Sequence, residues 1–161
     1  MNIVDISTKK IYAIQISRVD EADLATMSNE RYFFDWKKEK SYEIWKLTIV
    51  GERDILGLVS FESIDEEKRI HIRLLAASQE NVGKDKIYDG IIGNLLAYVA
   101  RQAVMKYAEW ACISLRPKTQ LAEHYIKKYK MNTTGMTLSL EVPEIVELIE
   151  RYGYEEERKN D

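Results

Sequence analysis

The chain has 161 residues, of which 45% are hydrophobic and 32% charged. That length suits one domain, and that composition excludes a disordered or a membrane-embedded protein. The net charge of −3 disfavours nucleic acid or an anionic membrane surface as a partner. A single cysteine and two histidines give no internal disulfide and disfavour a zinc site, so we expect no metal. No apolar run approaches the ~20 residues that span a bilayer, and the N-terminus lacks a signal-peptide core, so the expected location is cytoplasmic.

The first half of the chain reads mainly as strands, because apolar and polar residues alternate. Residues 21–40 are polar with scattered apolar positions and predict one or two short helices. The links between the last three strands are short and charged, which favours antiparallel hairpins because parallel strands need long crossovers. The predicted strands cover residues 10–19, 42–51, 55–64 and 69–77.

The second half begins with a change of period from two to about 3.6 residues. Apolar residues recur every four positions from Ile87 to Ala103 and predict an amphipathic helix over 86–107. A strand, a helix, a strand and a closing helix behind Pro143 follow, over 110–115, 119–130, 136–142 and 144–152.

This order predicts an α/β fold, with a mixed central sheet and helices on both faces. The crossover from strand 69–77 to strand 110–115 should be parallel. We expect one domain over residues 1–153 and a charged, frayed tail over 154–161. Strand 136–142 is expected at an edge of the sheet, where it could pair with a second copy of the chain, so the sequence is compatible with a homodimer.

Three of the seven glycines, Gly83, Gly90 and Gly93, fall within eleven positions before and inside the long helix. The first turn of a helix has unpaired N–H groups and a partial positive charge, so it can bind phosphate. Lys84 and Lys86 could add charge. The spacing fits neither a P-loop nor a Rossmann fingerprint. The alternative is that these glycines only allow tight packing on the sheet.

The element order, this glycine turn and residues 116–131 together resemble the GNAT superfamily of acyl-CoA-dependent N-acyltransferases, over roughly residues 10–142. In that family the turn carries Arg/Gln-x-x-Gly-x-Gly/Ala, and its amides hold the pyrophosphate of coenzyme A. Gly90 matches the first glycine, whereas Ile87 replaces the basic or amide residue and Ile92 the small one. A shifted match runs through Asn81, Gly83 and Lys84.

The resemblance implies acetyl-CoA as acyl donor and direct attack by an amine acceptor, either a small molecule or a protein. It also implies that a backbone N–H near Leu75 to Ala77 stabilises the oxyanion. The implied cofactor contacts are Leu75, Ala76, Ala77, Lys86, Tyr88, Asp89, Gly90, Ile91, Ile92 and Gly93.

For catalysis the resemblance implies Tyr125, since many members carry a tyrosine before a short charged run at this point. A phenol with pKa ≈ 10 can protonate a thiolate with pKa ≈ 8.5. Lys130 and Met131 stand where the family has Gly-Phe, and Lys118 and Thr119 occupy the region of its frequent Asn. The alternative for Tyr125 is a packing role.

His71 is the candidate base because its imidazole titrates near neutral pH. The alternatives are Glu62 and Glu80, and a lone strand histidine is often structural. His124 fits a surface position, and Cys112 an inert core thiol.

The aromatic residues at 32–36 and Trp45 could line an acceptor pocket, but such residues more often form core. The rival function is a GNAT-fold binding or regulatory module that has lost catalysis. A local basic patch at Lys127, Lys128 and Lys130 would be needed for a role with nucleic acid.

Overall fold

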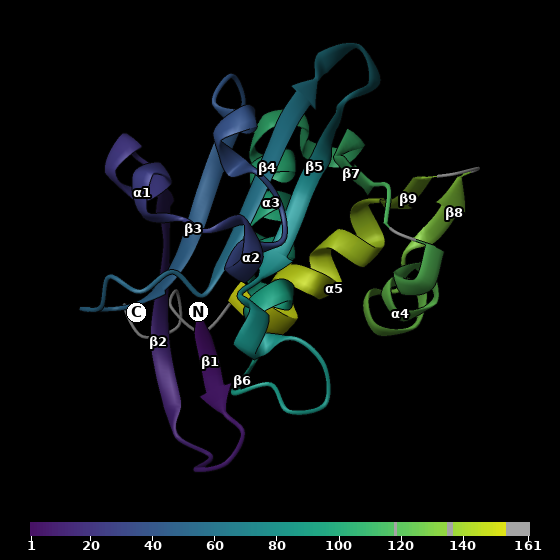
Figure 1. Ribbon diagram of the computed structural model, residues 1–161. Coiled ribbons are helices and arrows are strands. Elements are labelled where there is room, and N and C mark those ends of the chain that lie inside the picture. Colours follow the sequence, from purple (N-terminus) through teal and green to yellow (C-terminus); the bar gives the residue numbers. More distant parts are fainter. Residues whose placement is uncertain (118, 135–136, 154–161) are drawn as a thin grey trace. The chain divides into compact units, whose positions relative to one another are not determined.

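The computed structural model describes residues 1–117, 119–134 and 137–153. Its strands form one nine-stranded sheet in the order β6-β1-β2-β3-β4-β5-β7-β9-β8 (Figure 1). The strands are β1 (Asn2–Asp5), β2 (Ile11–Arg18), β3 (Glu43–Ile49), β4 (Gly57–Ile64), β5 (Arg69–Ala77), β6 (Tyr88–Asp89), β7 (Cys112–Leu115), β8 (Asn132–Thr134) and β9 (Thr137–Leu140). The α-helices are α1 (Glu21–Thr26), α2 (Asn29–Tyr32), α3 (Ile91–Tyr107), α4 (Thr119–Tyr129) and α5 (Val142–Gly153).

The sheet is mixed, as the sequence predicts. β5 and β7 pair in parallel from Arg69↔Cys112 to Ile72↔Leu115, which confirms the predicted crossover through α3. Antiparallel pairing joins β1 to β2, β2 to β3 and β7 to β9. Four short 3-10 helices complete the described chain: η1 (Trp36–Glu39), η2 (Asp65–Glu67), η3 (Gln79–Asn81) and η4 (Ala108–Trp110).

Two parts of the sequence prediction are wrong at the start of the chain and before α3. Residues 2–5 form strand β1, which the sequence analysis leaves without structure. The helix predicted from residue 86 begins at Ile91, because Tyr88 and Asp89 form β6 and Gly90 has φ +103°, outside the helical region. Strand β8 is also missed, and β7 begins at Cys112 rather than at residue 110. The predicted tail over 154–161 lies outside the described residues.

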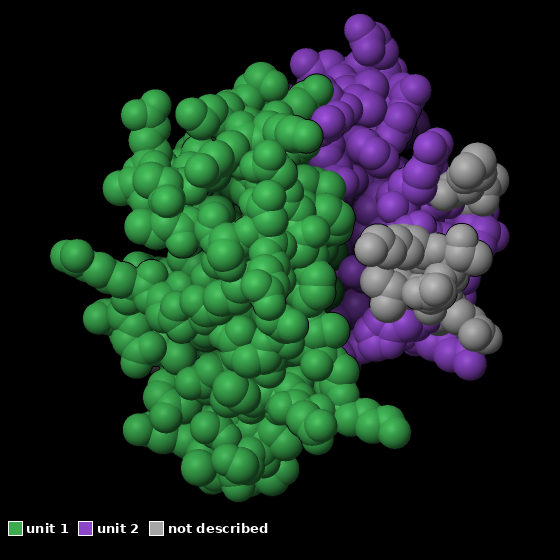
Figure 2. Space-filling model, viewed as in Figure 1, with its two compact units in different colours: residues 1–60, 74–95 green, residues 61–73, 96–161 purple. Residues whose placement is uncertain are grey.

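The chain divides into two compact units (Figure 2). Unit 1 contains residues 1–60 and 74–95, and unit 2 contains residues 61–73 and the described residues from 96 on. β4, β5 and α3 each contribute residues to both units.

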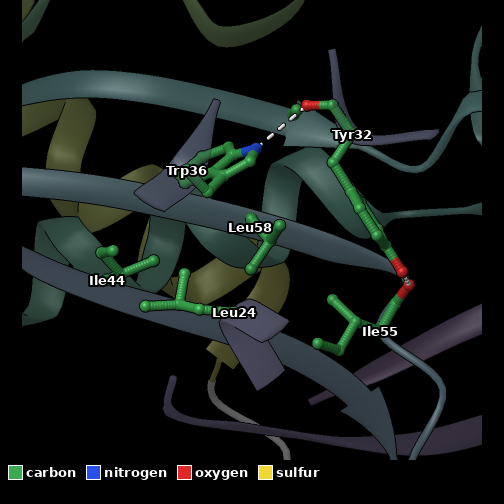
Figure 3. Packing of buried hydrophobic residues seen from close by; sticks show 7 residues of the cluster. Leu24, Tyr32, Trp36, Ile44, Ile55 and Leu58 are labelled. Carbon is green, nitrogen blue, oxygen red and sulfur yellow. Dashed lines mark hydrogen bonds between the residues drawn. The ribbon is translucent and has the colours of Figure 1, made fainter. Parts of the chain in front are cut away.

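The core of unit 1 is built around two aromatic residues that are also tied down by hydrogen bonds (Figure 3). Trp36 is 2% exposed, and its Nε1 donates to the Tyr32 carbonyl at 3.0 Å. The Tyr32 hydroxyl donates to the carbonyl of Ile55 at 2.9 Å. Buried aromatic polar atoms need such partners, so both residues are core residues rather than pocket walls. Leu24, Ile44, Ile55, Leu58 and Ala76 complete the cluster.

Helices cover both faces of the sheet in unit 1, as predicted. Leu58 of β4 joins the cluster formed by α1, α2 and η1. A Cβ atom added to the preceding residue, Gly57, would lie 2.6 Å from Ile91 and 3.0 Å from Leu95 of α3. Because successive strand residues point to opposite faces, α3 covers the face opposite to α1 and α2.

The core of unit 2 consists of fully buried aliphatic residues from α3, β7 and α5. Val99, Ala103, Ile113 and Ile145 are each 0% exposed. Within the described parts of the chain, no helix is long and apolar enough to cross a membrane. Those same parts hold no group of three or more His, Cys, Asp or Glu side chains placed to share a metal ion.

Candidate functional site

The segment between β5 and α3, residues 78–90, is called the β5–α3 turn here, and it is anchored at its start by Arg31 of α2. The Arg31 guanidinium donates to Glu80 at 2.5 Å and forms a two-bond pair with Asp54 at 2.8 and 3.0 Å. These bonds hold the pKa of Glu80 below its usual value. Glu80 is therefore a poor candidate for a base near neutral pH.

The side chain of Asn81 fastens the two ends of the turn. Asn81 is 6% exposed, donates to the Ser78 hydroxyl at 2.9 Å and accepts from the Tyr88 N–H at 2.9 Å. The Ile87 N–H donates to the Glu80 carbonyl at 3.3 Å. Gly83 and Lys84 lie on the exposed part of the loop between these contacts. Asn81 therefore holds the two ends of the turn together, whereas the shifted family match would assign it to the binding of the cofactor phosphate.

The N-terminal strand fixes the second half of the turn. β6 pairs antiparallel with β1 through Val4↔Asp89 and Asp5↔Tyr88. The Ile6 N–H then donates to the Ile87 carbonyl at 2.9 Å. Ile87 is 44% exposed and stands in this extended segment rather than in the helix.

Gly90 and Asn94 connect the turn to α3. The Asn94 Nδ2 atom donates to the carbonyls of Gly90 at 2.7 Å and Asn2 at 2.8 Å, and the side chain is completely buried. A Cβ on Gly90 would lie 3.4 Å from that Nδ2 atom and 3.5 Å from the Asn2 carbonyl. Those distances are ordinary contacts, but φ at Gly90 is +103°, so a side chain there would strain the backbone. Asn94 is a site residue that the sequence analysis does not include.

The positive end of α3 carries no compensating acidic side chain in its first turn. By contrast, α1, α2 and α5 each have an acidic residue there. Lys86 and Asp89, which precede the helix, pair with each other at 2.9 Å. The first-turn amides of this 17-residue helix are thus electrostatically available to an anion.

The end of β5 and the start of α3 meet at Gly57. A Cβ there would touch Ile91 and would lie 3.4 Å from the Ala76 carbonyl. The predicted contacts at Leu75, Ala76 and Ala77 and those at Gly90, Ile91, Ile92 and Gly93 all belong to unit 1. Lys86, Tyr88 and Asp89 belong to it too, but they precede the helix instead of lying inside it.

In unit 2, the polar cluster on β5 and β7 consists of Arg69, His71 and Ser114, together with Glu67 of the preceding η2. Arg69 Nη1 donates to the Ser114 hydroxyl at 2.6 Å, and the same hydroxyl lies 2.9 Å from His71 Nδ1. Arg69 Nε also pairs with the carboxylate of Glu67. Ser114 is 2% exposed, so this network is partly shielded from water.

The pKa of His71 is lowered, first by burial and then by the charge of Arg69. Arg69 can only donate, so the Ser114 hydroxyl proton is available for His71 Nδ1. This arrangement suits the neutral ring with its proton on Nε2. For His71 to accept a proton at Nε2, Nδ1 must instead carry the proton and donate it to Ser114.

Tyr125 of α4 is 8% exposed, and burial raises the pKa of its phenol. Its ring lies 5.8 Å from that of Tyr129 and 5.9 Å from that of His124, measured between centroids. The phenol therefore stays protonated at neutral pH, as an acid must. His124 is exposed, as its surface interpretation predicts.

The remaining candidates have ordinary surroundings. Glu62 lies 3.8 Å from Arg73. Burial raises the pKa of the Cys112 thiol, which disfavours a reactive thiolate. Lys130 pairs with Glu147 at 2.6 Å, so part of the lysine charge near the end of α4 is neutralised. Lys118 lies outside the described residues.

β5 extends beyond the end of its neighbour β7. Its parallel pairing with β7 ends at Ile72↔Leu115, whereas β5 continues to Ala77. The last five residues of β5 thus extend past the last residue pair that β5 forms with β7. The N–H groups near Leu75 to Ala77, proposed as oxyanion donors, lie in this extension.

Comparison with solved structures identifies the fold. A spermidine/spermine N-acetyltransferase from Vibrio cholerae superposes with a TM-score of 0.60 at 11% identity, over 84% of this chain and 98% of that chain. A candidate streptothricin acetyltransferase from Bacillus anthracis, solved with acetyl coenzyme A, gives 0.59 at 9% identity over 81% and 99%. A candidate acetyltransferase of the GNAT family from Desulfovibrio desulfuricans gives 0.57 at 11% identity over 80% and 99%.

The chain has the GNAT fold. This confirms the fold expected from the element order and the glycine turn. No protein-family model matches the sequence, and a search of curated proteins gives no significant match. At these identities the similarity concerns the fold, so activity has to be argued from the site.

Proposed function

We propose that the protein is an acyl-CoA-dependent N-acetyltransferase that transfers an acetyl group from acetyl-CoA to an amine. The observation that carries this proposal is the start of α3. A GNAT fold presents there a long helix without acidic residues in its first turn, behind a glycine that no other residue could replace without strain. That chemistry suits the pyrophosphate of coenzyme A.

The cofactor contacts would be mainly backbone N–H groups of Gly90, Ile91, Ile92 and Gly93, with Lys86, Tyr88 and Asp89 beside them. The main chain needs no basic residue at the position of Ile87, which explains how an isoleucine is compatible with the site. Leu75 to Ala77 would hold the thioester, with a backbone N–H directed at the developing oxyanion.

In the proposed reaction, the lone pair of a neutral amine forms the N–C bond, and the C–S bond of the thioester breaks. The departing thiolate takes the proton of the Tyr125 phenol, which the burial of Tyr125 keeps protonated. The nitrogen also loses one proton, and the later transfer of this proton through solvent to the Tyr125 phenolate restores the starting protonation state. His71 is the candidate group that first receives this proton at Nε2, with Nδ1–H donating to Ser114.

The first experiment is thermal unfolding with and without acetyl-CoA, followed by an assay of thiol release with an amine. A ligand at about 100 times its Kd stabilises by about 2.7 kcal/mol, which raises the Tm by roughly 5–10 °C at this size. No shift at millimolar acetyl-CoA would contradict the cofactor assignment.

A sharper test uses Ile92, which is half-buried in the first turn of α3. Ile92→Glu places a carboxylate where it favours the helix but repels pyrophosphate. We expect unchanged or higher stability and at least tenfold weaker acetyl-CoA binding, with Ile92→Gln as the neutral control. A variant at Gly90 is less suitable, because any side chain there would strain the backbone at φ +103°.

The second candidate is a module that binds acetyl-CoA without transferring its acetyl group. The exposed Ile87 at the family's basic or amide position favours it. Tyr125→Phe separates the two candidates. If the protein is an enzyme, Tyr125→Phe should lower turnover roughly a hundredfold with unchanged acetyl-CoA affinity. If it is a binding module, neither the wild type nor Tyr125→Phe should release thiol.

A further inference from the structure

The pairing of β5 with β7 stops at two arginines. The last paired residues are Ile72 and Leu115, and the next residue on each chain segment is Arg73 or Arg116. Side chains alternate along strands, so continuing the register places both arginines on the face that carries His71 and Ser114. Both arginines are exposed.

The positive charges at this point are only partly balanced. Arg69 pairs with Glu67, and Arg73 lies 3.8 Å from Glu62. Among the side chains that the structure describes, those of residues 1–117, 124–133 and 137–152, none forms a hydrogen bond or an ion pair with Arg116. The charge of Arg116 is thus not balanced by a described side chain, on a protein whose net charge is −3.

Both arginines act on the same histidine. The charged groups that influence His71 are Glu62 from β4, Arg69 and Arg73 from β5, and Arg116 after β7. Arg73 and Arg116 each lower the pKa of His71. Two positive charges that act on the same histidine also repel each other, and an anion bound by both would offset that repulsion.

We propose that Arg73 and Arg116 bind an anionic group, a carboxylate or a phosphate, that the amine acceptor carries. This inference rests on the proposed acetyl transfer and names the acceptor class. Guanidinium groups present paired N–H donors that match the oxygens of either anion. The acceptor is thus an amine such as an amino acid or a phosphorylated amine, and not a polyamine with positive charges only.

The first test measures kcat/KM for thiol release with matched acceptors. L-Lysine is compared with cadaverine, which lacks the carboxylate, and O-phosphoethanolamine is compared with ethanolamine. The anionic member of at least one pair should be favoured by roughly tenfold or more, and the pair that shows it identifies carboxylate or phosphate. Equal or higher kcat/KM for cadaverine and for ethanolamine, the members without the anionic group, would overturn the proposal while leaving acetyl transfer intact.

Variants assign the effect to the arginines. Arg116→Gln should remove the preference, with a larger change in KM than in kcat, because the anion is bound equally before and during the reaction. Arg116→Lys should recover part of it by keeping the charge. Arg53→Gln, an exposed arginine of the turn before β4, is the matched control and should keep the preference. A preference that survives in Arg116→Gln and Arg73→Gln contradicts the site.

The second test needs no turnover. The two histidines of the chain allow the His71 ring to be followed by NMR as the pH changes. Millimolar lysine or O-phosphoethanolamine should raise the apparent pKa of His71 in the wild type, since a bound anion offsets the two arginines, and Arg116→Gln should show no such rise. If no amine supports thiol release, this result still supports the anion site while the enzyme function fails. An unchanged His71 titration with both compounds overturns the site.

Discussion

The β5–α3 turn and the polar cluster on β5 and β7 are stabilised in different ways. In the turn, the decisive contacts are backbone pairing with β1, the amides of Asn81 and Asn94, and space left by glycines. In the polar cluster, charged side chains hold a single histidine through a serine hydroxyl. Neutral contacts depend little on salt and pH, whereas charge-based contacts depend on both. The part of the turn from Asn81 to Asn94 should therefore keep one geometry, whereas the Arg31 ion pairs at its start and the polar cluster should respond to salt and pH.

The largest change in stability is expected at Gly57, whose close neighbours are held by packing and not by charges. Gly57→Val would force side-chain atoms into Ile91 and the Ala76 carbonyl. We expect a loss of about 3 kcal/mol in the free energy of unfolding, measured by urea denaturation. Ile91→Ala in the same chain should recover part of this loss, because it removes the atom that a Cβ on Gly57 would strike. A double variant that is simply additive would show that the strain lies elsewhere.

The next largest change in stability is expected at Asn94, which fastens the β5–α3 turn. Asn94→Ala removes the donor for the carbonyls of Asn2 and Gly90, and we expect a loss of about 2 kcal/mol. Hydrogen exchange should become faster at residues 2–5 and 87–91. Exchange in β7 of unit 2 serves as the internal control and should not change. Uniformly faster exchange would mean global destabilisation rather than release of the turn.

The ion pairs of Arg31 are expected to contribute less, since this side chain is 33% exposed. Arg31→Gln should cost about 1 kcal/mol at low salt. The difference from the wild type should shrink in high salt, unlike that of Asn94→Ala. Equal salt dependence in the two variants would contradict the contrast between charged and neutral anchoring.

The smallest effect is the pH dependence that His71 introduces. Its pKa in the folded protein is below the unfolded value of 6.5, so the unfolded chain takes up the proton first as the pH falls. His71 therefore costs no stability above about pH 6.5, and it destabilises progressively as the pH falls below that value. His71→Gln should flatten the stability profile in that range. The carboxylates with lowered pKa values, such as Asp23 and Glu80, act at lower pH.

Local sequence patterns were sufficient for most of the architecture. Alternation placed β2 to β5, and the four-residue repeat placed α3, because each pattern reflects one buried face. The pairing of β1 with β6 could not be predicted, since two short segments far apart in the chain carry no periodic signal. Asn94 reads as one polar residue on an apolar helix, and its role depends on a carbonyl 92 positions away.

The candidate site was predictable where chemistry follows residue type, and not where it follows contacts. Gly90, Tyr125 and His71 could be selected from sequence because glycine, phenol and imidazole have distinct properties. Gly57, an isolated glycine in a predicted strand, is a usable signal for close backbone approach, but it was not among the candidate residues selected from the sequence. The relation between Arg73 and Arg116 becomes apparent only from the pairing of β5 with β7, which ends at the residue before each arginine.

The hydrogen bond between Asn94 and the Asn2 carbonyl has a consequence for folding kinetics. It closes a loop of 92 positions, and contacts of such separation form only after the chain entropy of closing the loop has been overcome. The β5–α3 turn should thus become ordered after the folding transition state. Asn94→Ala should then accelerate unfolding and leave the refolding rate nearly unchanged.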